Sequence, residues 1–264
     1  MTESSELGQL IASLRELIGR IEQFGVRGKL DHEIAVRRAY RRNRPTDEAS
    51  LLRLLCAMIA YSQAANSASV TRVLPVIDEM FGDYDPSRVA RLSTPTLKNK
   101  FWTRLGALRY PTKIESMVSC AEAMVRIEKS GSTLVAMIEE SLIPLELVEP
   151  AGIVTFWARF QRLQAALKDA RMPFFGSLTS LCHLLKDLGY PCMKPDSGVL
   201  ASAASLGIVP TKRNYNDSDR RVAVETLQRC CIPLRTEMAV LDLYLLINGG
   251  MFWARQFVRS DYYA

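Results

Sequence analysis

A lone carboxylate, Asp196, follows a proline at the start of a predicted helix, where it could act in catalysis or as a helix cap. It lies between Pro195 and Ser197, seven residues after Gly189 ends an apolar helical stretch. A fixed carboxylate can stabilise a positive charge that develops in a transition state, and it can orient an attacking water. Alternatively, Asp196 only caps the helix predicted by "SGVLASAASLG". The local sequence favours the cap, and the two roles are compatible.

Helical periodicity dominates the elements that must position this carboxylate. Apolar residues recur at spacings of three and four in "LGQLIASLRELIGRIEQF" and in later stretches as far as "RTEMAVLDLYLLINGGMFWARQF". A basic helix is expected to run up to Pro45, and Thr46 or Asp47 offers an N-cap for the next helix. Alternating strand patterns are nearly absent. The sequence therefore predicts an all-α protein of about a dozen helices.

The net charge, the lengths of the apolar runs and the first residues limit the class of protein to which the sequence can belong. The net charge of +6 and the pI of about 9.0 fit a nucleic-acid binder, although many other proteins share them. No apolar run reaches the roughly 18 residues of a membrane span. The first residues lack a basic region before an apolar segment, so we expect a cytoplasmic protein without a signal peptide.

The potential metal ligands are scattered. The six cysteines form no CxxC motif, and His32 and His183 are far apart in sequence. We therefore expect reduced, buried thiols, a hydrogen-bonded His183, no metal site and no cofactor.

Three stretches resemble the helix-hairpin-helix DNA glycosylase superfamily, which includes endonuclease III and the adenine and alkylbase glycosylases. "PFFGSLTS", residues 173 to 180, resembles the family hairpin Pro-Gly-hydrophobic-Gly-x-x-Thr-Ala, with Phe174 replacing the first glycine. In "YSQAANSASV", Gln63 falls on a glutamine that relatives place near the flipped base, and Asn66 falls on a helix cap. "RLGALRYPTKIESMVSCAEAM" resembles a helix start in mid-barrel. The matches keep the family's order and end at the Pro-Asp step of Asp196.

The resemblance implies a two-lobed fold. Residues 46 to 190 would form the family's six-helix barrel lobe, which ends in the hairpin, and residues 1 to 45 plus 191 to 264 would form a second helical lobe. The implied partner is double-stranded DNA, bound by a monomer in the cleft between the lobes. One nucleotide would be flipped out, and Asp196 would stabilise the transition state of base removal.

The resemblance also implies which residues meet DNA. Outward N–H groups at the start of a helix hold a phosphate with the help of the helix dipole, which assigns this contact to Phe175, Gly176, Ser177 and Thr179. In "VRRAYRRNR", Arg37 and Arg41 are either phosphate contacts or part of a solvated helix face. The candidates for a base pocket or wedge are Gln63, Leu178, Lys194 and Trp157. Aromatic residues such as Trp157 are more often core than base-stacking walls.

One position bears on the type of reaction. Relatives that also nick the strand carry a lysine just before the hairpin threonine, and it forms a Schiff base with the sugar. That place holds Leu178, which has no nucleophilic atom. We therefore expect a monofunctional glycosylase that leaves an abasic site. Lys186 is about 12 Å further along the helix by its rise, so Lys194 is the alternative nucleophile.

The identity of the excised base stays open. An alkylated purine would indicate base excision repair, and a bulky modified base, as in some phage genomes, would indicate defence. Gly198, where many relatives have histidine, could open space beside the acid. The alternative to an enzyme is a DNA-binding or lesion-sensing module that kept the fold without the chemistry.

Overall fold

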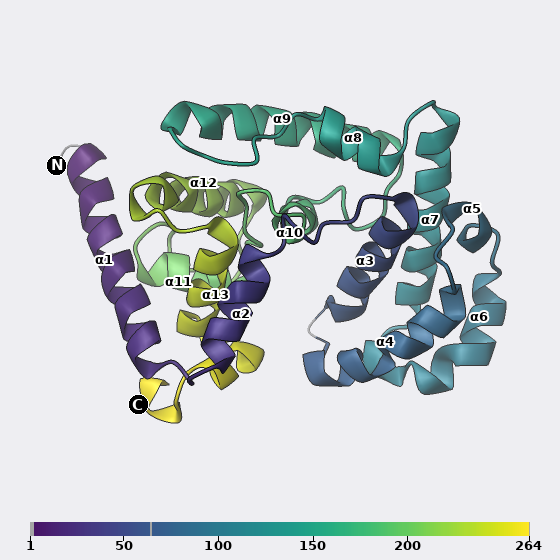
Figure 1. Cartoon of the computed structure of the whole chain (residues 1–264), viewed down its shortest axis with the longest axis horizontal. Coiled ribbons are helices and arrows are strands. Elements are labelled where there is room, and N and C mark those ends of the chain that lie inside the picture. Colours follow the sequence, from purple (N-terminus) through teal and green to yellow (C-terminus); the bar gives the residue numbers. More distant parts are fainter. Residues whose placement is uncertain (1–2, 64, 264) are drawn as a thin grey trace. The chain divides into compact units, whose positions relative to one another are not determined.

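The computed structural model describes residues 3–63 and 65–263. Within these ranges the secondary structure consists of helices and contains no β-strand, so the all-α prediction is confirmed (Figure 1). Every helix in the described ranges is too short or too polar to cross a lipid bilayer. The chain divides into two compact units, the first made of Met1–Arg44, Ile143–Ala158 and Leu178–Ala264, and the second of Pro45–Leu142 and Arg159–Ser177.

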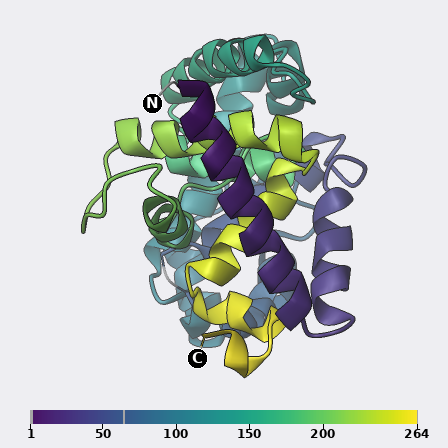
Figure 2. The same ribbon diagram turned by 90° about the vertical axis from the view of Figure 1, so that its left-hand side faces the viewer.

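The first unit is built around one buried helix, α13 (Met238–Asn248). All residues from Met238 to Ile247 are buried, because the sequence "MAVLDLYLLI" is apolar on every face except at Asp242. Around α13 pack α1 (Glu3–Phe24), α2 (Lys29–Arg38), α10 (Leu178–Asp187), α11 (Ser197–Ser205) and α12 (Asp217–Leu234). Figure 2 shows α1 lying across the yellow C-terminal segment. The short helices η3 (Phe252–Phe257) and η4 (Ser260–Tyr263) end the unit.

The second unit is centred on α7 (Thr112–Lys129). Against it lie α3 (Glu48–Tyr61), α5 (Pro86–Val89), α6 (Thr94–Phe101) and α8 (Leu134–Glu140), while α4 (Ser67–Phe81) packs on α3 and α6. The short helices η1 (Trp102–Arg104) and η2 (Gly106–Leu108) lead from α6 to α7. Helix α9 (Pro150–Asp169) contributes its first part to the first unit and its second part to this one.

Side-chain caps set several helix starts as the sequence predicts. Asp47 accepts a hydrogen bond from the N–H of Ser50 at 2.8 Å, and Asn66 accepts one from the N–H of Ser69 at 3.0 Å. Both acceptors satisfy N–H groups that the first turn of a helix leaves without partners. The starts of α3 and α4, which flank Gln63, are therefore encoded locally.

Two expected helices end earlier than predicted. The basic helix stops at Arg38, and turns follow it up to Asn43, because "YRRNR" offers no apolar face to continue an amphipathic helix. The last long helix stops at Asn248, since Gly249 and Gly250 follow it and Gly250 has a φ of +68°. The six-helix barrel and the lobe boundaries at residues 46 to 190 stay a prediction, and both residues 143–158 and α10 pack in the first unit.

Candidate active site

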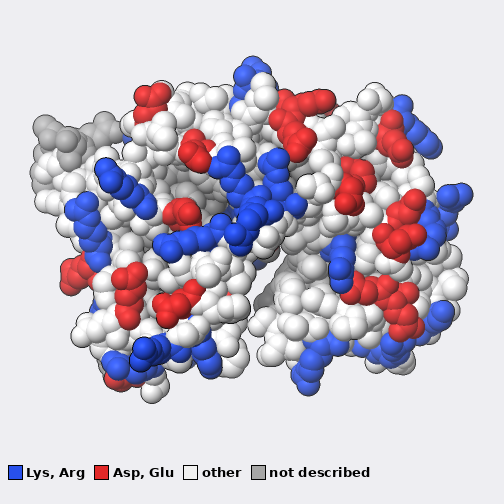
Figure 3. All heavy atoms as spheres, in the orientation of Figure 1, with Lys and Arg blue, Asp and Glu red and all other residues white. Residues whose placement is uncertain are grey.

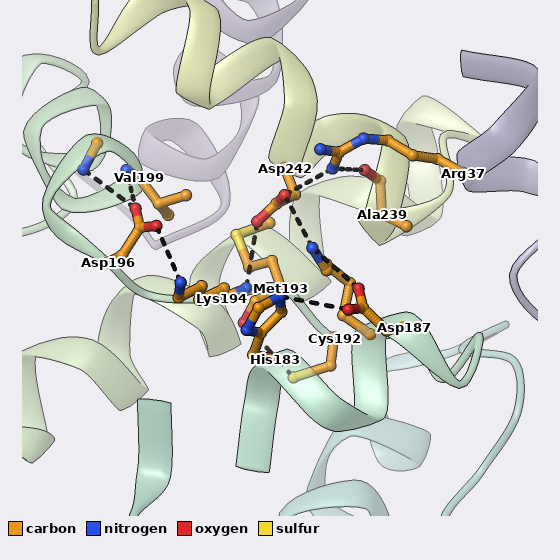
Figure 4. A network of polar contacts seen from close by, with 12 residues as sticks. Arg37, His183, Asp187, Cys192, Met193, Lys194, Asp196, Val199, Ala239 and Asp242 are labelled. Atoms are coloured by element: carbon orange, nitrogen blue, oxygen red, sulfur yellow. Dashed lines mark hydrogen bonds and ion pairs between the residues drawn. The ribbon is translucent and has the colours of Figure 1, made fainter. Parts of the chain in front are cut away.

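Asp196 caps α11 with one carboxylate oxygen and leaves the other for a second contact. Its Oδ1 accepts the N–H of Gly198 at 3.1 Å and the N–H of Val199 at 3.3 Å (Figure 4). The cap predicted from the sequence is therefore confirmed. Its Oδ2 lies 3.8 Å from Nζ of Lys194, and 22% of the side chain is exposed. The carboxylate is thus held in one orientation while part of it stays accessible.

The surroundings of Asp196 shift its titration. Burial raises the pKa of Asp196 above its ordinary value, and the Lys194 ammonium group opposes this by favouring the charged form. Asp242 adds a further upward contribution to the pKa through charge repulsion. Among the surrounding charges, Lys194 therefore contributes most to favouring the ionised form of Asp196.

A fully buried carboxylate, Asp242 of α13, organises the backbone before Asp196. Its Oδ2 accepts a hydrogen bond from Nη1 of Arg37 at 2.6 Å, and its Oδ1 accepts the N–H of Lys194 at 3.2 Å (Figure 4). Nζ of Lys186 lies 3.6 Å away. Burial alone would raise the pKa of Asp242, but Lys186 and Arg37 lower it below its ordinary value. The buried charge is compensated and ties α2, α10 and α13 to Lys194.

Three side chains of α10 complete this charged cluster. Nζ of Lys186 lies 3.2 Å from Oδ1 of Asp187, and Nε2 of His183 lies 3.3 Å from Oδ2 of the same residue. Burial lowers the pKa of His183, although Asp187 partly opposes this. The prediction of a partnered His183 is confirmed. Lys186 is buried among its acidic partners.

A second set of hydrogen bonds holds the segment between α10 and α11, at Pro191. The indole N–H of Trp157 donates to Oε1 of Gln228 at 2.9 Å, and Nε2 of Gln228 donates to the carbonyl of Pro191 at 2.8 Å. Trp157 is only 2% exposed and packs in the interior of the first unit, and its place in a base pocket or wedge stays a prediction. Trp157 supports, through Gln228, the chain that leads to Asp196.

The space expected beside Gly198 is filled. A Cβ atom at Gly198 would lie 2.3 Å from Cγ of Met251, and one at Gly249 would lie 2.3 Å from the carbonyl oxygen of Gly198. The backbones of α11 and of the end of α13 therefore approach closely, and only glycine fits at this contact. The small residue serves helix packing rather than an open pocket next to Asp196.

The two arginines proposed as phosphate contacts lie in different settings. Arg37 is 5% exposed and is held by Asp242, by Glu33 and by the carbonyl of Ala239. These partners hold the Arg37 guanidinium inside the first unit, and its role as a DNA contact stays a prediction. Arg41 is exposed, and its Nη1 lies 2.6 Å from Oε1 of Glu146.

The turn before α10 places a residue with a side chain, Phe174, in a backbone conformation that favours glycine. Phe174 has a φ of +64°, the left-handed region that glycine adopts without strain. The N–H of Phe175 donates to the carbonyl of Pro173 at 2.7 Å, and that of Ser177 donates to the carbonyl of Phe174 at 3.1 Å. These two N–H groups are used within the turn, so Gly176 and the first turn of α10, with Thr179, remain as the phosphate donors that we propose.

Other hairpin side chains have structural roles. Phe175 and Leu178 are 2% and 7% exposed, which places both side chains in the interior. A Cβ at Gly176 would lie 3.1 Å from Cγ of Lys168, so an exposed lysine lies beside the turn. Sequence reasoning missed Lys168, which brings a positive charge to the hairpin.

Gln63 is exposed in a left-handed turn at the end of α3, with a φ of +57°. The turn is fixed by Lys113, whose Nζ donates to the carbonyl of Ala60 at 2.9 Å and to that of Ser62 at 2.7 Å. Burial lowers the pKa of Lys113 to about 8. Gln63 belongs to the second unit, as do Gly176 and Ser177, whereas Lys194 and Asp196 belong to the first.

Sequence reasoning also missed Asp242 and Gln228, although a single acid inside an otherwise apolar helix is a sign of a buried ion pair. All six cysteines are buried free thiols, and the described residues contain no cluster of three or more His, Cys, Asp or Glu side chains that could hold a metal ion. The arrangement offers an oriented, partly exposed carboxylate beside an ammonium group. No family model, curated protein or solved structure matches this chain.

Proposed function

We propose that this protein is a monofunctional DNA glycosylase that flips a modified or damaged base out of duplex DNA and hydrolyses its N-glycosidic bond. The family is the helix-hairpin-helix superfamily, on the strength of the three sequence stretches described above. Asp196 would stabilise the developing sugar cation, and water would be the nucleophile. The product would be an abasic site, in the course of either repair or defence against DNA with modified bases.

The observation that carries this proposal is that the two oxygens of the Asp196 carboxylate make different contacts. Oδ1 makes both cap hydrogen bonds, while Oδ2 makes neither and lies 3.8 Å from Nζ of Lys194. A carboxylate that is fixed in advance needs little reorganisation when a positive charge develops beside it, which is the property required for electrostatic catalysis. Asp242 and Gln228 support the backbone that holds it.

The identity of the bases released is the direct test. Duplexes that carry a panel of alkylated, oxidised or bulky modified bases are incubated with the protein, and the free bases are identified by mass spectrometry. We expect at least one base to be released while the strand stays intact until alkali or an abasic endonuclease is added. Borohydride should trap no adduct, because Leu178 replaces the hairpin lysine. Efficient trapping would contradict the monofunctional mechanism and would implicate Lys194.

A DNA-binding or lesion-sensing module is the second candidate, and one observation favours it. The two hydrogen bonds of Oδ1 account for an aspartate at position 196 as a helix cap, without any catalytic role. This candidate predicts salt-sensitive binding to duplex DNA with no base released from any substrate of the panel.

A further inference from the structure

A cavity of about 490 Å³ opens within the first unit, apart from the Asp196 carboxylate. Its walls come from the end of α2, the segment 145–148, the residues after α10, and the junction of α12 with α13. The volume lies within the range of sites that hold small organic ligands. Two of its lining residues, Gly189 and Arg41, approach each other closely. A Cβ at Gly189 would lie 2.4 Å from Cα of Arg41, so only glycine fits there.

Arginine side chains dominate the charge of this cavity. Arg38, Arg41 and Arg235 line it and are exposed, and Arg37 lies in the wall behind them. Figure 3 shows positive side chains gathered over the C-terminal end of α2 on the face in view. Guanidinium groups bind phosphate through paired, charge-assisted hydrogen bonds. The first-turn residues Met238 and Ala239 of α13 also line the cavity, so the positive end of a helix dipole adds to the attraction for an anion.

Two carboxylates form ion pairs with arginines of this cavity. Oε1 of Glu146 lies 2.6 Å from Nη1 of Arg41, and Oε2 of Glu237 lies 3.5 Å from Nε of Arg38. Both pairs are largely exposed, and such pairs contribute little stability and exchange readily with other ions. A terminal phosphate carries more negative charge and more acceptor atoms than a carboxylate, and the phosphate of a strand carries as much charge, so either can compete with these carboxylates for the arginines.

Much of the remaining wall is apolar. Leu145, Leu147, Ile232 and Met238 line the cavity beside the arginines. A ligand that fits both surfaces carries an anionic group and a flat or apolar body. A nucleotide has this chemistry, with a phosphate for the arginines and a base for the apolar wall.

We propose that this cavity binds a nucleotide through its phosphate, with Arg41 and Arg235 as the principal contacts. The nucleotide is either free or part of a DNA strand, and for the strand the inference rests on the DNA binding of the proposed function. The site is separate from base excision, since Asp196 is not among the residues that line it.

Calorimetric titration of the full chain at low salt with dTMP, and with thymidine as the uncharged control, tests the site. We expect dTMP to bind at least tenfold more tightly than thymidine, because a charge-assisted contact contributes about one order of magnitude in affinity. The double variant Arg41→Gln with Arg235→Gln should lose this preference. Glu146→Gln should tighten dTMP binding, since it frees Arg41. Arg259→Gln is the control for losing one exposed positive charge outside the cavity, because Arg259 is an exposed arginine paired with Asp261 at 3.4 Å; Arg41→Gln alone is its match in charge.

A titration with a 12-base-pair duplex distinguishes the two sources of phosphate. If dTMP binds as expected and the double variant leaves duplex affinity unchanged, the ligand is a free nucleotide. If the double variant weakens duplex binding at least tenfold and dTMP competes, the phosphate belongs to the strand. The inference is overturned if dTMP binds no better than thymidine and the double variant binds duplex as Arg259→Gln does. If the wild-type protein binds dTMP but does not bind the duplex, the proposal of DNA binding is refuted and the nucleotide site in the cavity is still supported.

Discussion

The buried carboxylate of Asp242 accepts the backbone N–H of Lys194 at 3.2 Å, which ties the centre of the first unit to the residue two positions before Asp196. Asp242 is 0% exposed and is neutralised by Arg37 and Lys186. Breaking a buried ion pair costs several kcal/mol, so these pairs hold the Asp242 side chain in the position from which it accepts the N–H of Lys194. The position of the Asp196 carboxylate therefore depends on α2, α10 and α13 together.

The ammonium group of Lys194 should set the pH range in which Asp196 is active. Burial raises the pKa of Asp196 and Lys194 lowers it, so Lys194→Met should raise this pKa further. The carboxylate must be charged to act, and excision falls as pH drops through its pKa. The acid limb of the single-turnover rate should therefore move to higher pH in Lys194→Met. Lys194→Arg keeps the charge and should keep the wild-type limb, whereas an unmoved limb in both variants would show that Lys194 does not influence Asp196.

Because Phe174 has a left-handed backbone conformation, we expect glycine to be more stabilising than alanine at this position, the reverse of the usual order. Glycine normally destabilises a position by about 0.5–1 kcal/mol relative to alanine, but a φ of +64° penalises every residue with a Cβ. Phe174→Gly and Phe174→Ala remove the same partly buried ring, so their difference reports the backbone alone. Urea unfolding should find Phe174→Gly more stable than Phe174→Ala by about 1 kcal/mol. Gly19→Ala, inside α1, is the control in which alanine should be the more stable residue.

Lys113 should stabilise the Gln63 turn in a pH-dependent way. Lys113→Met leaves the carbonyls of Ala60 and Ser62 without their donor and should cost about 2–3 kcal/mol of unfolding free energy. Burial lowers the lysine pKa from 10.5 to about 8, so between these values the unfolded chain binds more protons and stability rises with pH. The stability gap between wild type and Lys113→Met should widen from pH 7.5 to pH 10 in urea unfolding. A constant gap would mean that Lys113 keeps an ordinary pKa.

A negative charge at Gly176 should weaken duplex binding without regard to sequence. Gly176→Asp places a carboxylate next to the proposed phosphate, and the new Cβ displaces only the flexible Lys168 side chain. We expect affinity to fall about tenfold and the salt dependence to decrease by about one ion. Gly19→Asp makes the same charge change in open space on α1. If the two variants bind duplex equally well, with folding intact by circular dichroism, the hairpin does not contact DNA.

Local rules predicted part of this structure well. The caps at Asp47, Asn66 and Asp196 depend on residues within three positions of each other, so sequence patterns contain the necessary information. The all-α class follows from periodicity over whole helices in the same way.

Long-range partners account for what the sequence did not predict. Arg37 looked equivalent to Arg41 in "VRRAYRRNR", yet Arg37 pairs with an acid 205 positions away and is buried. The indole of Trp157 is satisfied by Gln228, 71 positions away. Such pairings depend on how α2, α9, α12 and α13 pack, which no local pattern encodes.

Single-turnover excision by Asp196→Asn tests the central claim most directly. Asparagine keeps the size and can still accept the N–H groups of Gly198 and Val199, so the fold should change little. It removes the charge that would stabilise the sugar cation by about 3–4 kcal/mol, so base release should slow by roughly 10²- to 10³-fold while duplex binding persists or tightens. A folded variant that releases base at the wild-type rate would contradict the account and leave Asp196 as a helix cap alone.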